Sequence, residues 1–173
     1  DYKVTGVQTC ALPISGFIGS NFIHYLANHY GPDITIHNVD ALTYAGNLAN
    51  LDNLANTNYH FHHACITDRA ALTGIFAHPI DCVVHFAAES HVDRSIHDSS
   101  PFITTNVLGT QCLLDVAMAH SVKQFIHIST DEVYGSTQTG YFTETSPLNP
   151  SSPYAASKAS SDLVALAYYK TFG

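Results

Sequence analysis

Tyr154 and Lys158 are four positions apart, a spacing that places two side chains on the same face of a helix. A lysine cation beside a phenol favours the phenolate. It therefore lowers a pKa that starts near ~10 and makes the phenol a base at neutral pH. YxxxK also occurs by chance on ordinary helices. Its position, one loop after a strand that ends in three polar residues, favours catalysis.

Those polar residues are Thr130, Asp131 and Glu132, which directly follow the predicted strand 124–129. Ligands bind outside the carboxyl ends of strands in open α/β sheets. Two adjacent carboxyl groups there can divide general-acid and general-base work, provided that their surroundings separate their pKa values. A solvated acidic turn is the alternative interpretation.

A second set of residues suits a dinucleotide. Gly16 and Gly19 open a predicted helix, where glycines let a diphosphate approach the backbone amides at its positive end. Asp40 ends the next predicted strand, 21 residues beyond Gly19, where a carboxylate suits the ribose diol of NAD. Each feature alone also fits an ordinary turn. Together they predict NAD binding.

Helical and strand patterns alternate around these residues. We expect helices at 17–29, 68–76 and 99–120 and from 153 onward, and strands at 34–40, 59–66, 81–88 and 124–129. Strands that alternate with helices imply right-handed crossovers and a doubly wound parallel sheet of the α/β class.

Composition excludes several other classes of protein. Apolar residues make up 46% of the 173 residues and charged residues 12%, which is enough apolar material for a core and too little charge for a coiled coil. The net charge is −8 without any basic run, so we expect no nucleic-acid partner. No apolar stretch approaches the ~20 residues that span a bilayer, so we also expect no membrane partner.

Cysteines and histidines are numerous without a metal-binding spacing. The four cysteines contain no CxxC pair, which favours a reducing compartment, the cytoplasm, over a zinc or disulfide framework. Of the twelve histidines, His60 and His62 share one face of a strand and His63 lies on the other. We therefore expect no metal site.

The two ends of the chain differ from the rest. Residues 1–15 contain VTGVQTCALPI, which matches the translation of a common sequencing adaptor, and Pro13 stands where a strand should lead into the glycine turn. We expect a non-native segment 1–15 followed by an NAD-binding domain at 16–173, truncated at both ends. If the central strand is lost, its neighbours lose their pairing, and we expect poor folding and weak NAD binding.

Several segments together are more specific than any single motif. They are VDALTYAGNLANL (39–51), HFAAESHVDRSI (85–96), TNVLGT (105–110), ISTDEVYG (128–135) and SSPYAASKASSD (151–162). The chain from Gly16 onward resembles the dTDP-glucose 4,6-dehydratase family of extended short-chain dehydrogenases/reductases. The resemblance implies a Rossmann-like sheet, incomplete because its first strand is replaced and the C-terminal substrate domain is missing.

The same resemblance implies an NAD-dependent lyase of deoxysugar biosynthesis that acts on a nucleotide sugar and forms a homodimer at full length. Its reaction converts dTDP-glucose to the 4-keto-6-deoxy sugar by hydride transfer, loss of water and hydride return. Tyr154 would take the proton of the sugar 4-hydroxyl, Glu132 the C5 proton, and Asp131 would protonate the departing C6 hydroxyl.

The resemblance also assigns binding roles. Ser90 and Thr130 would face the substrate. The cofactor would contact Gly16, Phe17, Ile18, Gly19, Asp40, Leu42, Thr43, Cys65, Ile66, Phe86, Ala87, Ala88, Thr105, Tyr154 and Lys158.

Three departures from the family pattern stand out. The first glycine of the fingerprint is missing, Ala41 replaces a lysine, and Cys65 replaces an aspartate near the adenine. Two alternatives therefore stay open: another nucleotide-sugar epimerase or dehydratase of the same superfamily, and an inactive NAD-binding fragment. The adjacent acids argue against an epimerase, which eliminates no water.

Overall fold

The sheet is built of five parallel strands in the order β3-β2-β1-β4-β5, in a computed structural model that describes residues 7–12, 15–54 and 58–173. The strands are β1 (Val7–Leu12), β2 (Ile34–Asp40), β3 (Asn58–His63), β4 (Cys82–His85) and β5 (Gln124–His127). Every strand runs in the same direction, so the carboxyl ends of all five lie along one edge. The doubly wound α/β fold predicted from the sequence is confirmed.

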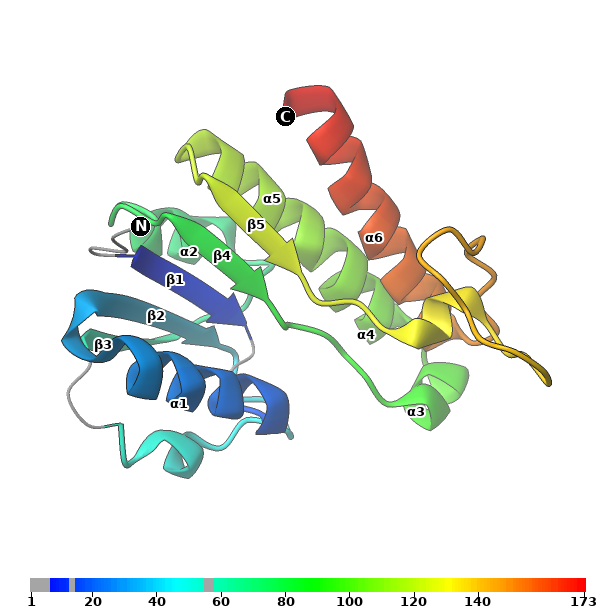
Figure 1. Ribbon diagram of the computed structural model, residues 1–173, viewed down its shortest axis with the longest axis horizontal. Helices are drawn as coiled ribbons and strands as arrows, with labels where there is room; N and C mark the ends of the chain where they lie inside the picture. Colours follow the sequence, from blue (N-terminus) through cyan, green and yellow to red (C-terminus); the bar gives the residue numbers. More distant parts are fainter. Residues whose placement is uncertain (1–6, 13–14, 55–57) are drawn as a thin grey trace.

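Helices connect the strands and cover both faces of the sheet (Figure 1). They are α1 (Phe17–Tyr30), α2 (Arg69–Ile75), α3 (Val92–His97), α4 (Ser100–Phe102), α5 (Thr110–Ala119) and α6 (Pro153–Phe172), with a π-helical stretch, Ile103–Gly109, between α4 and α5. The expected helix 99–120 is therefore one continuous helical run with a wider turn inside it. The short α3 was not predicted.

Two apolar cores lie on opposite faces. On one face, α1 packs against β2 and β4 through Ile23, Ile36 and Val84. On the other face, α2 and α5 pack against the sheet through Phe76 and Leu113, both almost wholly buried. Burial on both faces explains why the segment that contains β4 reads as a mostly apolar run.

The ends of the elements have identifiable causes. The Asp68 carboxylate accepts from the amide of Ala71 and caps α2, as predicted. The Ser152 hydroxyl caps α6 in the same way, with Pro153 in its first turn. β3 ends three residues before the predicted boundary of residue 66, because the Ala64 amide still bonds to Asp40 but Cys65 already begins the turn into α2.

The central strand corrects an expectation. Residues 7–12 form β1, which pairs with β2 on one side and β4 on the other. The expected loss of pairing on these neighbours is therefore wrong. Backbone amides and carbonyls of β2 and β4 need partners in the middle of a sheet, and an extended segment can supply them whatever its side chains. Pro13 lies outside the described residues.

The helical run Ser100–Ala119 corrects the expectation that no apolar stretch is long enough to span a bilayer. Among the described residues, this run alone has the length and the apolar character to cross a membrane. Half of that run is buried inside the protein. Leu113 and Val116 pack in the apolar core between the sheet and the helices α2 and α5. The run therefore reads as the core helix of a folded domain.

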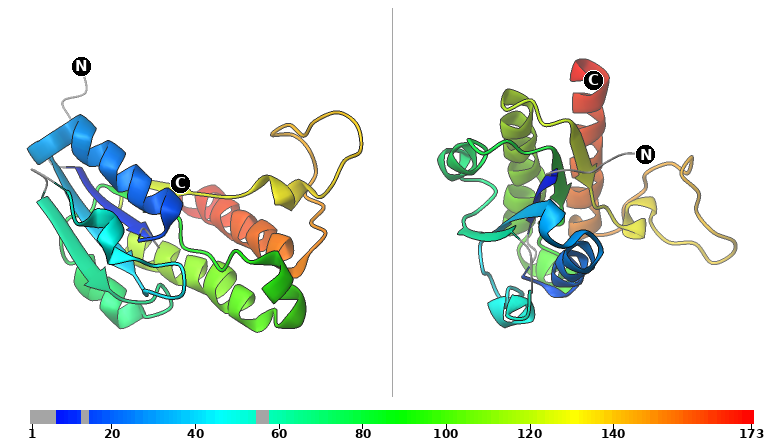
Figure 2. Two further views of the ribbon diagram at one scale, coloured as in Figure 1. Left: turned by 90° about the horizontal axis from the view of Figure 1, so that it is seen from below. Right: turned by 60° about the vertical axis from the view of Figure 1, so that its left-hand side comes forward.

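A long loop after β5 extends away from the sheet (Figure 2). It leaves a short 3-10 turn, Asp131–Tyr134, through Gly135, whose φ is +89°. A Cβ on Gly135 would lie 2.4 Å from the carbonyl oxygen of Asn149, so both the conformation and the space require glycine. The Asn149 amide in turn donates to the Val133 carbonyl, which closes the base of the loop.

Candidate active site

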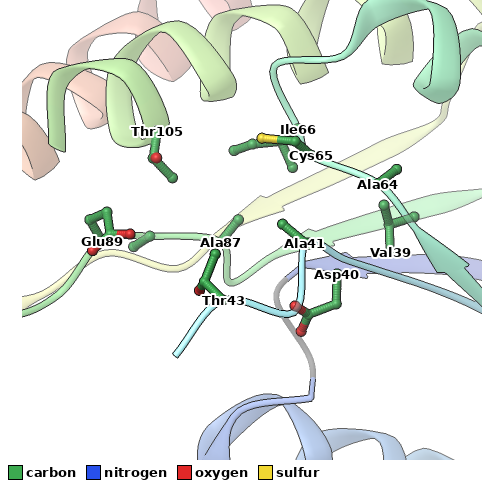
Figure 3. Close-up of a pocket in the computed structure, with 11 residues that line it drawn as sticks. Val39, Asp40, Ala41, Thr43, Ala64, Cys65, Ile66, Ala87, Glu89 and Thr105 are labelled. Atoms are coloured by element: carbon green, nitrogen blue, oxygen red, sulfur yellow. The ribbon is translucent and has the colours of Figure 1, made fainter. Parts of the chain in front are cut away.

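A hollow lies at the carboxyl edge of the sheet. Its walls come from the ends of β2, β3 and β4 and from the π-helical stretch (Figure 3). Seven of the predicted cofactor residues line it: Asp40, Thr43, Cys65, Ile66, Ala87, Ala88 and Thr105. The hollow therefore collects residues from four separate segments of the sequence.

Asp40 organises the floor of this hollow. Its carboxylate is almost fully buried and accepts from the backbone amides of Ser15, at 2.9 Å, and Leu42, at 2.7 Å. Leu42 has a positive φ of 49°, so the chain turns sharply after β2. A carboxylate offers about four lone-pair sites, so Asp40 can still accept from a ligand hydroxyl.

The start of α1 lies beside Asp40. Gly16 is its N-cap and provides no side-chain hydrogen bond, so the first amides of a 14-residue helix have no side-chain partner. Phe17 and Ile18 are 83% and 66% exposed on this first turn, whereas Gly19 is buried. An uncapped helix N-terminus is suited to an anionic group such as a diphosphate.

Cys65 and Ile66 form another wall. The Cys65 thiol contacts the Thr67 hydroxyl at 3.1 Å and is exposed, so this position offers no carboxylate to a ligand. Ile66 packs against Gly109, where an added Cβ would lie 2.4 Å from the Ile66 side chain. The glycine therefore lets the β3 end approach the helix that follows β4.

The acid pair lies on the 3-10 turn after β5. The Thr130 hydroxyl accepts from the Glu132 amide at 3.3 Å and caps the turn. Asp131 and Glu132 are both exposed, while Val133 is buried and anchors the turn. The carboxyl groups are therefore held on a fixed backbone and face solvent.

Tyr154 lies close to this turn. Burial raises the pKa of its phenol, and the carboxylates of Glu132 and Asp131 raise it further, while the Thr130 hydroxyl lowers it. Because the Thr130 hydroxyl and both carboxylates act on the phenol, the acid turn lies near Tyr154. The structure thus brings together Thr130, Asp131, Glu132 and Tyr154, as the sequence predicts.

Lys158 behaves differently from the expectation. It is 3% exposed, and its ammonium donates to the Ile128 carbonyl at 2.7 Å. Burial lowers the pKa of Lys158, and the Asp162 carboxylate raises it. The expected lowering of the Tyr154 pKa by this lysine is therefore wrong, because the phenol is governed by its burial and its acidic neighbours.

Sequence reasoning missed a clamp centred on Asn106, which lies in the π-helical stretch. Its amide group bonds twice to the backbone of Glu89, at 2.8 and 3.0 Å, and donates to the Ser157 hydroxyl at 2.8 Å. Ser95 accepts from the Tyr154 amide at 3.1 Å. Polar residues at buried helical positions, such as Asn106 and Ser157, were the available signal.

Phe86 and Ser90 are among the predicted site residues that do not line the hollow. Phe86 packs against Phe22 of α1, with ring centroids 5.3 Å apart, on the opposite face of the sheet. Ser90 is exposed on the segment after β4. Among the described residues, no group of three or more His, Cys, Asp or Glu side chains could hold a metal ion.

Comparison with known proteins assigns the family. The sequence profile described as GDP-mannose 4,6 dehydratase matches residues 13–173. The chain belongs to this family. It is 52% identical over 166 residues to dTDP-glucose 4,6-dehydratase of Streptomyces antibioticus. The alignment covers 92% of this chain and 48% of the relative. The chain spans about half the length of the curated relatives it matches.

Solved structures agree with this family assignment. A dTDP-glucose 4,6-dehydratase from Streptomyces venezuelae, DesIV, crystallised with NAD, superposes with a TM-score of 0.90 at 48% identity, over 96% of this chain and 53% of its own. A UDP-Glc/GlcNAc 4-epimerase from Campylobacter jejuni superposes with a TM-score of 0.87 at 28% identity. This superposition covers 96% of this chain and 50% of the epimerase chain. The Rossmann-like fold is thus shared, whereas the sequence is more similar to the dehydratase.

Proposed function

We propose that this chain is the cofactor-binding half of an enzyme that dehydrates dTDP-glucose to dTDP-4-keto-6-deoxyglucose. The observation that carries the proposal is the acid pair, whose carboxylates act on the phenol of Tyr154. Water elimination needs one group that takes a proton and another that gives one, and Asp131 and Glu132 provide both at the same edge as Tyr154.

The residues present suit NAD. Asp40 accepts from ribose hydroxyls, and the uncapped amides at the start of α1 meet the diphosphate. Ala87, Ala88 and Thr105 leave room beside the strand ends. When bound, NAD supplies the hydride acceptor and donor that no side chain can provide. The relatives that hold NAD support the same assignment.

The side chains then have separate tasks. Tyr154 takes the proton of the sugar 4-hydroxyl, and Lys158 holds its ammonium one helical turn away. Glu132 removes the proton at C5, which the neighbouring ketone acidifies, and Asp131 protonates the departing C6 hydroxyl. Thr130, which caps the acid turn and acts on the phenol, orients the sugar between them, and Ser90 contacts the nucleotide sugar.

A 4-epimerase is the second candidate, supported by the structural likeness to such enzymes at 26–28% identity. Epimerisation inverts one carbon and eliminates no water, so it has no use for two carboxyl groups beside the phenol. The acid pair therefore favours the dehydratase.

The deciding experiment uses the full-length protein that contains this chain, incubated with dTDP-glucose and NAD. We expect a 4-keto-6-deoxy product. Glu132→Gln should lower kcat by about 10²–10⁴-fold, the contribution typical of a general base. Glu144→Gln, an exposed carboxylate in the loop beyond the acid turn, is the matched control and should leave kcat unchanged. A 4-epimer as the only product would overturn the proposal.

We further propose a cytoplasmic homodimer for the full-length protein and keep residues 1–15 as a non-native segment before the NAD-binding domain 16–173. The free state of Cys65, Cys82 and Cys112 supports a reducing compartment. Because the matched relatives are about twice as long, we propose that the 173-residue chain alone shows no turnover and binds NAD weakly or not at all.

A further inference from the structure

Tyr154, Lys158 and Asp162 lie on one face of α6, spaced four residues apart. The first two have proposed roles in the reaction, but Asp162 has none. Its carboxylate Oδ2 accepts from the Ser129 hydroxyl at 2.6 Å, and its Oδ1 lies 3.2 Å from His127 Nε2. Asp162 is therefore bound to the segment that leaves β5.

The same segment is tied to α6 at every residue. His127 Nε2 also lies 3.0 Å from the Ser161 hydroxyl, and the Ile128 carbonyl accepts from Lys158. Ser129 donates to Asp162. Three consecutive residues are thus fixed to two turns of one helix, directly before Thr130 caps the acid turn.

The charges around Lys158 explain why a carboxylate is needed there. An ammonium with one backbone carbonyl as partner is costly to bury. The titratable groups that interact with it are His85 on β4 and Asp162 on α6, and His127 on β5 lies beside both of these groups. Burial holds the pKa of His85 well below its ordinary value, so this ring stays neutral. Asp162 is the one carboxylate among these three groups.

We infer that Asp162 is a positioning residue: it places a carboxylate one helical turn from the buried Lys158 ammonium and fixes residues 127–129, which set the place of the acid turn. This inference rests on the proposed function for the meaning of Lys158 and the acid turn. Displacement of reacting groups by about 1 Å can reduce a rate by about 10²-fold, so the register of this segment matters for the reaction.

The first test measures Lys158 directly and needs no catalysis. The chain has four lysines, so labelled lysine side chains can be followed by NMR as the pH is raised. In the 173-residue chain, Asp162→Asn should lower the pKa of Lys158, because it removes the carboxylate that raises this pKa. Asp162→Glu should restore most of that loss.

Asp81→Asn is the matched control. Its carboxylate pairs with Lys123 at 2.7 Å on the exposed edge before β4, so the same chemical change should affect Lys123 and leave Lys158 unchanged. Ser129→Ala removes one hydrogen bond while it keeps the Asp162 charge. It should move the Thr130 amide resonance but leave the Lys158 titration in place, which provides a readout if Asp162→Asn does not fold.

The second test uses the full-length enzyme. Asp162→Asn should reduce kcat at least 10-fold at neutral pH with little change in KM, and the Glu variant should recover activity. If the wild type shows no dehydratase activity, the proposed function fails, yet the Lys158 titration still decides the inference. An unchanged Lys158 titration in Asp162→Asn, or a kcat equal to that of an active wild type, overturns it.

Discussion

Two groups of histidines lie on the same face of the sheet, and they differ in what surrounds them. The β2–β3 group consists of His37, His60 and His62 with His78, which follows α2. The β4–β5 pair consists of His85 and His127, which are neighbours in register with centroids 5.1 Å apart. The first group makes ring contacts within itself, whereas the second is bonded to helices.

The β2–β3 group is a stack of imidazoles around one buried ring. His37 is 3% exposed, bonds to His62 at 3.0 Å and stacks with three neighbouring rings. Burial lowers the pKa of His37 to about 4, and the charges of its neighbours add to this effect. A stack of this kind is stable only while its central ring is neutral.

The β4–β5 pair instead connects the sheet to the helices that carry the site. His85 bonds to the Thr110 hydroxyl at 2.8 Å, and that hydroxyl donates to the Asn106 carbonyl. His127 contacts Ser161 and Asp162 of α6. Histidines on one sheet face thus support local packing at one end and the geometry of the active site at the other.

Truncation of the buried His85 side chain should have the largest effect on the stability of the fold. His85 is 1% exposed and fills space between β4 and α5. His85→Ala should lower the free energy of unfolding by about 2–4 kcal/mol, because it leaves a cavity and removes the bond to Thr110. Urea unfolding at pH 7 measures this. His63→Ala, on an exposed ring, is the control and should change stability by less than about 0.5 kcal/mol; equal effects would contradict the prediction.

Much of this architecture is readable from the sequence. Local signals mark the strands and helices: the apolar run before His85, the cap at Asp68 and the proline at the start of α6. Their alternation along the chain predicts the doubly wound sheet. The sequence also predicts Thr130, Asp131, Glu132 and Tyr154 as site residues from their types and their place after a strand, and the structure places them near one another.

The remainder depends on contacts that have no local pattern. Lys158 was expected beside the phenol, but its bond to the Ile128 carbonyl depends on how α6 lies against β5. Phe86 follows the strand end as its neighbours do, but the alternation of the strand turns it toward α1. The pairing of β1 follows from what its neighbours lack rather than from its own sequence.

The stacked group should make stability depend on pH. The pKa of His37 is about 4 in the folded protein against an ordinary value of 6.5, so the unfolded chain binds the proton first as the pH falls. Stability is therefore full above pH 6.5 and declines toward pH 4, by at most about 3 kcal/mol for this ring.

Urea unfolding from pH 7 to pH 4 measures that slope. His37→Leu should flatten it, and His63→Leu, the same change on an exposed ring of the neighbouring strand, should leave it as in the wild type. A wild-type slope that persists in His37→Leu would place the acid sensitivity elsewhere, with the enclosed His85 as the next ring to test.

The smallest effect should come from the outermost ring of the stack. His78 is exposed and contacts His37 with centroids 5.0 Å apart, so His78→Gln should change stability at pH 7 by less than about 0.5 kcal/mol. Its charge opposes protonation of His37, so its removal should raise the pKa of His37 slightly. Imidazole NMR titration measures this, with His63→Gln as the control. A fall in the His37 pKa would mean that His78 stabilises the charged ring, and the β2–β3 group would then resemble the β4–β5 pair in depending on specific partners.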